Sequence, residues 1–195
     1  MRQYINRFFI YIYAAFIFTI ILPQDTFAGE SIKSRYFNID IADGIDKVSL
    51  LRKLHAEYFL RLDTVFFNTS INDSNASQLI GKTLDGIYAQ ASDILDIHMY
   101  DLTVGLKILP DTESISKELT PYFNKKINVP SFYYFDENTI YIAYSDVTLG
   151  MLSHEVAHAI VSHYFVVPPP ARLQEILTGY VEYTMRKLAK DLPTK

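Results

Sequence analysis

The stretch His154-Glu-Val-Ala-His158 decides how the rest of this chain is interpreted. It matches the pattern H-E-x-x-H, and the residues on both sides of it are mostly apolar. On an α-helix, positions i and i+4 lie on one face, so the two imidazoles can point to the same place. Ring nitrogens about 2.0–2.1 Å from one Zn²⁺ would form two sides of a tetrahedral site. The pattern therefore predicts a helix that carries two ligands of one metal ion.

Glu155 follows the first histidine and is rotated by about 100° from it around the helix. It is poorly placed as a third ligand, but it can reach a water molecule in the open coordination position. On a solvated helix such a trio would lie among Lys, Glu and Gln, yet no other residue of these types lies between Ser145 and Pro168. We therefore expect a buried active helix in which Glu155 is the general base.

The N-terminus has the layout of a secretory signal peptide. Arg2 and Arg7 precede an apolar run at 8–22, and the small residues Thr26 and Ala28 indicate cleavage after Ala28. At 1.5 Å per residue this run spans only about 22 Å, short of the roughly 30 Å of a bilayer core. Residues 1–28 are predicted to direct export to the periplasm or the medium, and an uncleaved membrane anchor is the less favoured alternative.

Composition limits the partners, the cross-links and the metal ligands that this chain can have. The net charge of −4 gives no indication of a nucleic-acid partner. The chain has no cysteine, which excludes both disulfides and thiolate ligands. Residues 29–195 have the length of one domain, while the oligomeric state stays open.

Hydrophobic periodicity predicts an α+β fold. Residues 29–42 are expected to be a loosely held lead-in, 44–97 a helical part and 102–190 the catalytic core. The expected helices are 44–67, 77–96, 112–124, 145–165 (capped by Ser145 or Asp146) and 171–190, and the expected strands are 102–109, 131–135 and 139–144, the last two as a hairpin.

A catalytic zinc site needs a third protein ligand as well as an open position. His163 lies five residues after His158, so one continuous helix turns it roughly 140° away. The longer motif with three histidines needs Gly at 161 and His at 164, where this chain has Val161 and Tyr164. The third ligand is therefore expected from another element.

The final helix offers Glu175 and Glu182, which are seven residues apart and lie on nearly the same face. We prefer Glu175, because it lies early in a helix that returns antiparallel after the turn at 168–170. Glu182 is either a solvated charge or a partner of a ligand histidine. Gly179 is expected to let the two helices approach each other.

These residues resemble a zincin metallopeptidase of the gluzincin type. The stretch Glu175-Ile-Leu-Thr-Gly-Tyr-Val-Glu182 is similar to the E-G-x-A-x-Y-x-E pattern of small bacterial members with a peptidase MA-like domain and of the minigluzincins. The resemblance covers roughly residues 102–188. It implies His154, His158 and Glu175 as ligands of one Zn²⁺, with Glu155 as general base and proton shuttle.

The resemblance also implies a zincin-like domain with a small, mostly antiparallel sheet packed on the active helix. Two N-terminal helices and a C-terminal helix that bears the third ligand complete it. One strand within 131–144 would pair with an extended peptide substrate. From its residues alone, the aromatic segment 132–135 can belong to the core or line the cleft, and we favour the core.

Two positions depart from the family pattern, with Ile176 where Gly is usual and Thr178 where Ala is frequent. The family often supplies a Tyr or His that stabilises the oxyanion, and Tyr180, Tyr183 and His163 are equal candidates here. The expected activity is hydrolysis of peptide bonds in a peptide or protein substrate. The alternative is a catalytically silent or latent zinc-binding interaction module in the cell envelope.

Overall fold

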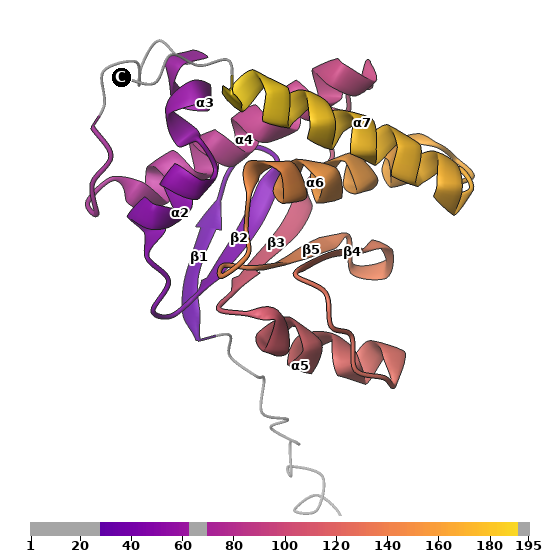
Figure 1. Cartoon of the computed structure of the whole chain (residues 1–195), viewed down its shortest axis with the longest axis horizontal. Helices are drawn as coiled ribbons and strands as arrows, with labels where there is room; N and C mark the ends of the chain where they lie inside the picture. Colours follow the sequence, from indigo (N-terminus) through magenta and orange to yellow (C-terminus); the bar gives the residue numbers. More distant parts are fainter. Residues whose placement is uncertain (1–27, 63–69, 191–195) are drawn as a thin grey trace, which may run out of the picture.

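Five strands form one mixed sheet at the centre of the computed structural model, which describes residues 28–62 and 70–190 (Figure 1). The strand order is β1-β2-β3-β5-β4. Pairing is antiparallel for β1 with β2 and for β4 with β5, and parallel for β2 with β3 and for β3 with β5. The α+β class is confirmed, but the sheet is not mostly antiparallel. The strands are β1 Gly29–Lys33, β2 Phe37–Ala42, β3 Val104–Leu109, β4 Ser131–Tyr134 and β5 Thr139–Ala143.

The expectation of a loose lead-in at 29–42 is wrong, because these residues form β1 and β2. In β2 the side chains of Phe37, Ile39 and Ile41 are buried and alternate with more exposed ones, as in a strand with one face on the core. β1 contains a single large apolar residue, Ile32, and gains its regular structure by pairing with β2 along its whole length. The segment is therefore part of the sheet.

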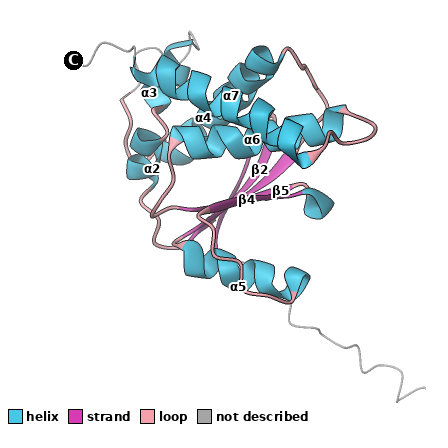
Figure 2. Ribbon diagram, turned by 45° about the vertical axis from the view of Figure 1, so that its right-hand side comes forward, coloured by secondary structure: helices cyan, strands magenta, loops and turns pink. Residues whose placement is uncertain are grey.

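Helices cover both faces of the sheet (Figure 2). Five of the described helices lie on one face, and α5 lies alone on the other. The predicted hairpin, the strand before it and most helices are confirmed to within a few residues. The helices are α2 Lys47–Lys53, α3 Ala56–Leu62, α4 Ala76–Leu95, α5 Thr112–Phe123, α6 Leu149–Tyr164 and α7 Ala171–Lys190.

Two helix boundaries differ from the sequence prediction. The helix expected at 44–67 is broken between α2 and α3, where His55 has a left-handed φ of 52°. α6 begins at Leu149 because the Thr148 hydroxyl accepts from the Met151 amide at 3.2 Å, so Ser145 and Asp146 precede the helix in a turn. The end of the first predicted helix, at 63–67, lies outside the described residues.

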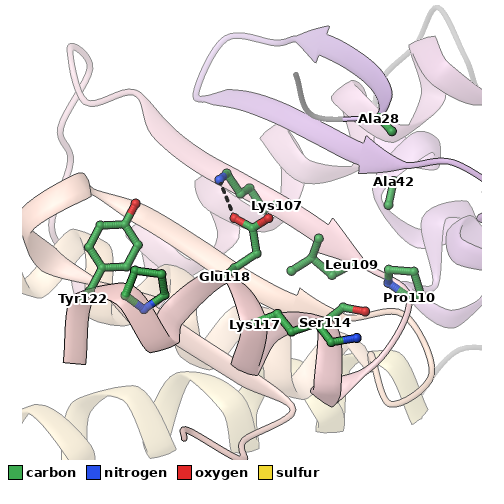
Figure 3. A pocket seen from close by; sticks show the side chains of 10 residues that line it. Ala28, Ala42, Lys107, Leu109, Pro110, Ser114, Lys117, Glu118 and Tyr122 are labelled. Atoms are coloured by element: carbon green, nitrogen blue, oxygen red, sulfur yellow. Dashed lines mark hydrogen bonds and ion pairs between the residues drawn. The ribbon is translucent and has the colours of Figure 1, made fainter. Parts of the chain in front are cut away.

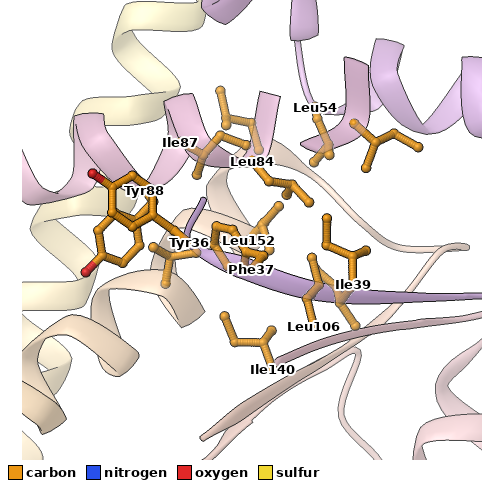
Figure 4. Close-up of a cluster of buried hydrophobic side chains, with 14 of the residues drawn as sticks. Tyr36, Phe37, Ile39, Leu54, Leu84, Ile87, Tyr88, Leu106, Ile140 and Leu152 are labelled. Carbon is orange, nitrogen blue, oxygen red and sulfur yellow. The ribbon is translucent and has the colours of Figure 1, made fainter. Parts of the chain in front are cut away.

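The main core lies between the sheet and its five-helix face (Figure 4). Large apolar side chains from β2, β3 and β5 meet those of α4 and α6, and the rings of Tyr36 and Tyr88 stack at 4.1 Å. A smaller cluster joins α5 to the opposite face of the sheet. This arrangement fixes α6, and therefore the pentad, against the sheet.

Truncating a core leucine should test this arrangement. Leu106 on β3 is 1% exposed, and Leu106→Ala is expected to lower the free energy of unfolding by about 2–5 kcal/mol through lost burial and a cavity. Leu173→Ala makes the same chemical change at a side chain that is 45% exposed, and should stay within about 0.5 kcal/mol of the parent. Denaturant unfolding measures both, and equal effects would contradict the assigned core.

The predicted signal peptide falls at 1–28, of which 1–27 lie outside the described residues, as do 191–195. Among the helices of the described part, none combines the length and the apolar character that a membrane crossing needs.

Candidate metal centre

The three predicted metal ligands come together where α6 and α7 pack side by side. The rings of His154 and His158, one turn apart on α6, have centroids 4.9 Å from each other. Glu175 on α7 places Oε2 at 3.5 Å from Nε2 of His154 and Oε1 at 3.4 Å from Nε2 of His158. One donor atom from each residue lies within 4.8 Å of the other two. Two adjacent helices thus build one group of donors.

The spacing of these donors fits a bound cation. Ligand distances of 2.0–2.1 Å in a tetrahedral site place the donor atoms about 3.4 Å apart. The contacts of Glu175 with His154 and His158, made by its two different oxygens, are close to this length, and they exceed the 2.7–3.2 Å of an ordinary N–H···O hydrogen bond. Two imidazoles and one carboxylate suit zinc and also other divalent transition metals. The site can therefore hold such an ion, and the donor set alone does not select zinc.

Glu182 supports one of the ligands from behind. Its Oε2 lies 3.1 Å from Nδ1 of His154, and its other oxygen pairs with Arg186. A carboxylate beside Nδ1 accepts a hydrogen bond from the N–H there, and in that tautomer the lone pair of Nε2 faces Glu175. The sequence left two roles open for Glu182, a solvated charge or a partner of a histidine. Its contact with Nδ1 of His154 supports the second role.

Replacing Glu182 with glutamine should weaken metal binding without removing a ligand. The neutral amide no longer fixes the imidazole of His154 as strongly, and such outer partners are worth about 10–100-fold in metal affinity. Competition with a chromophoric chelator measures the loss. Glu113→Gln, at a glutamate on α5 that is 69% exposed, is the matched control and should bind as the parent does. Unchanged affinity in Glu182→Gln would remove this residue from the centre.

Helix α7 contributes a hydroxyl that the sequence analysis did not assign to the centre. Thr178 is fully buried, and its Oγ1 lies 3.3 Å from Nε2 of His154. The expected role of Gly179 is wrong, since a Cβ at that position would meet nothing within 4 Å. The close approach occurs at Gly150 instead, where a Cβ would meet the side chain of Arg186.

Glu155 is buried beside this centre and is held by strand β4. It is 8% exposed, its Oε1 accepts from the Ser131 hydroxyl at 2.7 Å, and it also accepts from the backbone N–H of Tyr133. Burial raises the pKa of the Glu155 carboxyl, although the bond from Ser131 and the nearby His154 oppose this. A carboxylate with a raised pKa is suited to accept and return a proton.

Burial also affects His158, the second predicted ligand. It lowers the pKa of His158, with a further contribution from His154. The imidazole of His158 is therefore neutral at neutral pH, which is the form that binds metal ions.

A cleft of about 380 Å³ opens over these groups. Its walls include the three donor residues and Glu155, together with Pro168 and Gln174 from the start of the returning segment. Phe132, Tyr133 and Phe135 also line it, so the aromatic segment contributes to the cleft, the alternative that the sequence left open. Phe132 and Tyr133 also pack against the two cores, and the hairpin therefore serves both.

None of the three candidates for an oxyanion stabiliser lines the cleft. Tyr180 and Tyr183 are 57% and 67% exposed. Nε2 of His163 lies 2.9 Å from the hydroxyl of Tyr133, and its ring stacks on Phe135 with centroids 5.4 Å apart. His163 thus holds two aromatic residues of the cleft wall and lies behind them.

A second, larger cavity of about 700 Å³ lies between α5 and the opposite face of the sheet (Figure 3). Lys107 on β3 and Glu118 on α5 form an ion pair of 3.0 Å across it. None of the predicted site residues lines this cavity, so it is separate from the metal centre.

Comparison of the chain with protein-family models, curated proteins and solved structures found no match. The resemblance to gluzincins therefore depends on the two motifs and on the local geometry described above.

Proposed function

We propose that this protein is a zinc-dependent peptidase with a zincin-like domain of the gluzincin type. The observation that carries the proposal is the convergence of His154, His158 and Glu175 beside the buried carboxyl of Glu155. A donor set with this spacing next to a general base is the arrangement needed for metal-assisted hydrolysis.

The residues of the chain divide the chemistry among them. His154, His158 and Glu175 would hold the ion, and Glu182 orients the first imidazole. Bound zinc would polarise the scissile carbonyl and acidify the attacking water. Glu155 takes the proton of that water, which its raised pKa favours, and passes it to the departing amine. No covalent intermediate with the protein is required.

The edge strand β4 supports a peptide as the substrate. The Ala143 amide donates to the carbonyl of Pro130, so these two residues form a hydrogen-bonded pair between β4 and β5. Such pairs alternate with non-hydrogen-bonded pairs along antiparallel strands, so the backbone N–H and C=O groups of Ser131 and Tyr133 point away from β5. β4 ends the sheet, so an extended peptide can add to the outward groups of Ser131 and to the carbonyl of Tyr133, whose N–H already donates to Glu155. Such a strand would lie along the cleft that contains Glu155.

The N-terminal sequence supports a place of action for the proposed enzyme. The predicted signal peptide favours an exported enzyme of the periplasm or the medium, with peptides or proteins as partners. The acidic balance of the chain gives no reason to expect nucleic acid.

Hydrolysis of a diverse peptide library by the purified chain tests the proposal. We expect cleavage with one equivalent of zinc bound, loss of cleavage with a chelator and recovery when zinc is restored. Cleavage that withstands removal of all metal would contradict the mechanism. Stoichiometric zinc without any cleavage would favour the silent interaction module instead.

A further inference from the structure

Exposed apolar side chains gather near the junction of α6 and α7 and along α7. They lie on the last residue of α6, on the loop after it and on one side of α7, and we call them the apolar face. Its loop is strongly exposed, with Val166 at 102% and Val167 at 79%. The members of the apolar face are Tyr164, Phe165, Val166, Val167, Leu173, Ile176, Tyr180 and Tyr183, all at least 39% exposed.

The helical part of the apolar face follows the period of α7. Leu173, Ile176, Tyr180 and Tyr183 are spaced by three, four and three residues, which places them on one stripe. The buried residues of α7, including Val181, occupy the opposite side of the helix, and Glu175 projects from a third flank toward α6. The apolar face is thus independent of the donors of the metal centre.

Basic residues border the apolar face. Arg172 and Lys187, both exposed, stand near the two ends of the stripe. The acidic residues Glu175 and Glu182 of α7 instead face the histidines of α6. This local excess of positive charge contrasts with the net charge of −4 of the whole chain. An exposed apolar patch with a basic border is typical of a surface that binds partners with an apolar part and negative charges. The apolar side chains are buried against the partner, and the basic residues attract its anionic groups.

We propose that the apolar face docks onto a lipid bilayer that contains anionic headgroups. Val166 and Val167 enter the boundary between headgroups and acyl chains, and Tyr180 and Tyr183 lie at headgroup level, where tyrosine is enriched. Arg172 and Lys187 attract the anionic lipids. This inference does not depend on the peptidase activity.

The charges favour lipid over a second copy of the chain. An antiparallel pairing of two stripes about Thr178 brings Arg172 of one copy near the end that carries Lys187 of the other. A parallel pairing places each cation beside its own equivalent. Both arrangements set like charges together at an apolar contact, whereas anionic headgroups neutralise them.

Site-specific fluorescence can test the docking, because the chain contains no tryptophan. Val166→Trp introduces the only indole into the full chain. The vesicles contain three parts brominated phosphatidylcholine to one part phosphatidylglycerol. Tyr122→Trp is the matched control, since Tyr122 is 47% exposed on α5, across the sheet from α7. A site-specific quencher reports the docking face even if another segment of the chain also binds the vesicle.

We expect several-fold stronger quenching by the brominated lipid for Val166→Trp than for Tyr122→Trp. Adding Lys187→Gln should weaken the partitioning of Val166→Trp by roughly fivefold, the effect of one basic residue near an anionic surface. If Val166→Trp does not fold, Val167→Trp serves in its place. Equal quenching at both sites would overturn the proposal. So would a blue shift of Val166→Trp that grows with protein concentration without lipid, which would identify a second copy as the partner.

Discussion

The Glu155→Gln variant is expected to keep its metal and lose hydrolysis. Glutamine preserves the shape of the buried side chain and can still accept the hydrogen bond from Ser131, but it cannot take a proton. General base catalysis contributes about 10²–10⁴-fold, so kcat should fall by that factor. Steady-state kinetics on a cleaved peptide and metal analysis of the same sample measure the two effects separately.

Glu113→Gln is the control for this variant, because it makes the same change at an exposed glutamate on α5. It should retain full activity and full metal content. A Glu155→Gln variant with parental kcat would show that another group takes the proton. Loss of the metal from it would instead make Glu155 a ligand.

Glu175→Ala is expected to have the largest effect on metal binding, because it removes one of three donors. The affinity should fall by more than the roughly 100-fold upper limit for outer partners. When free metal exceeds the parental Kd by about 1,000-fold, binding stabilises the parent by about 4.1 kcal/mol. A 100-fold weaker variant retains only about 1.4 kcal/mol of this stabilisation. The increase in unfolding temperature on adding metal should therefore be clearly smaller for Glu175→Ala than for the parent, and thermal unfolding with and without metal measures it.

The position of Glu182 provides an internal comparison for this result. Glu182→Gln, which leaves all three donors in place, should lose less stabilisation by metal than Glu175→Ala. Parental affinity in Glu175→Ala would mean that the third ligand lies elsewhere. An equal loss in both variants would mean that α7 needs both carboxylates to stay in position.

The helices and the hairpin could be predicted because each shows its period within one short segment. α4 repeats apolar residues at three and four, and β3 alternates strictly. β1 could not be recognised, since its sequence Gly-Glu-Ser-Ile-Lys has one large apolar residue and becomes a strand only beside β2. The parallel pairing of β2 with β3 was equally hidden, because it depends on how the connecting helices pack.

The same distinction between local and distant contacts holds for the metal centre. The relation of His154, Glu155 and His158 is fixed by one helical turn. The proline turn at 168–170 then limits where a returning helix can place Glu175. Ser131 and Thr178 reach Glu155 and His154 only through tertiary packing, and neither residue type in a strand or helix carries a signal of that role.

All donors of the metal centre lie on a single helical hairpin, α6 and α7, joined by the short proline-containing connection. A short stiff connection costs little chain entropy to close. The centre can therefore assemble early and locally during folding, before the distant strands β1 and β2 have joined the sheet. An ion bound there would also link α6 to α7, because both helices supply donors. Val181 and Met185, buried in the main core, would still hold α7 in place after removal of the ion.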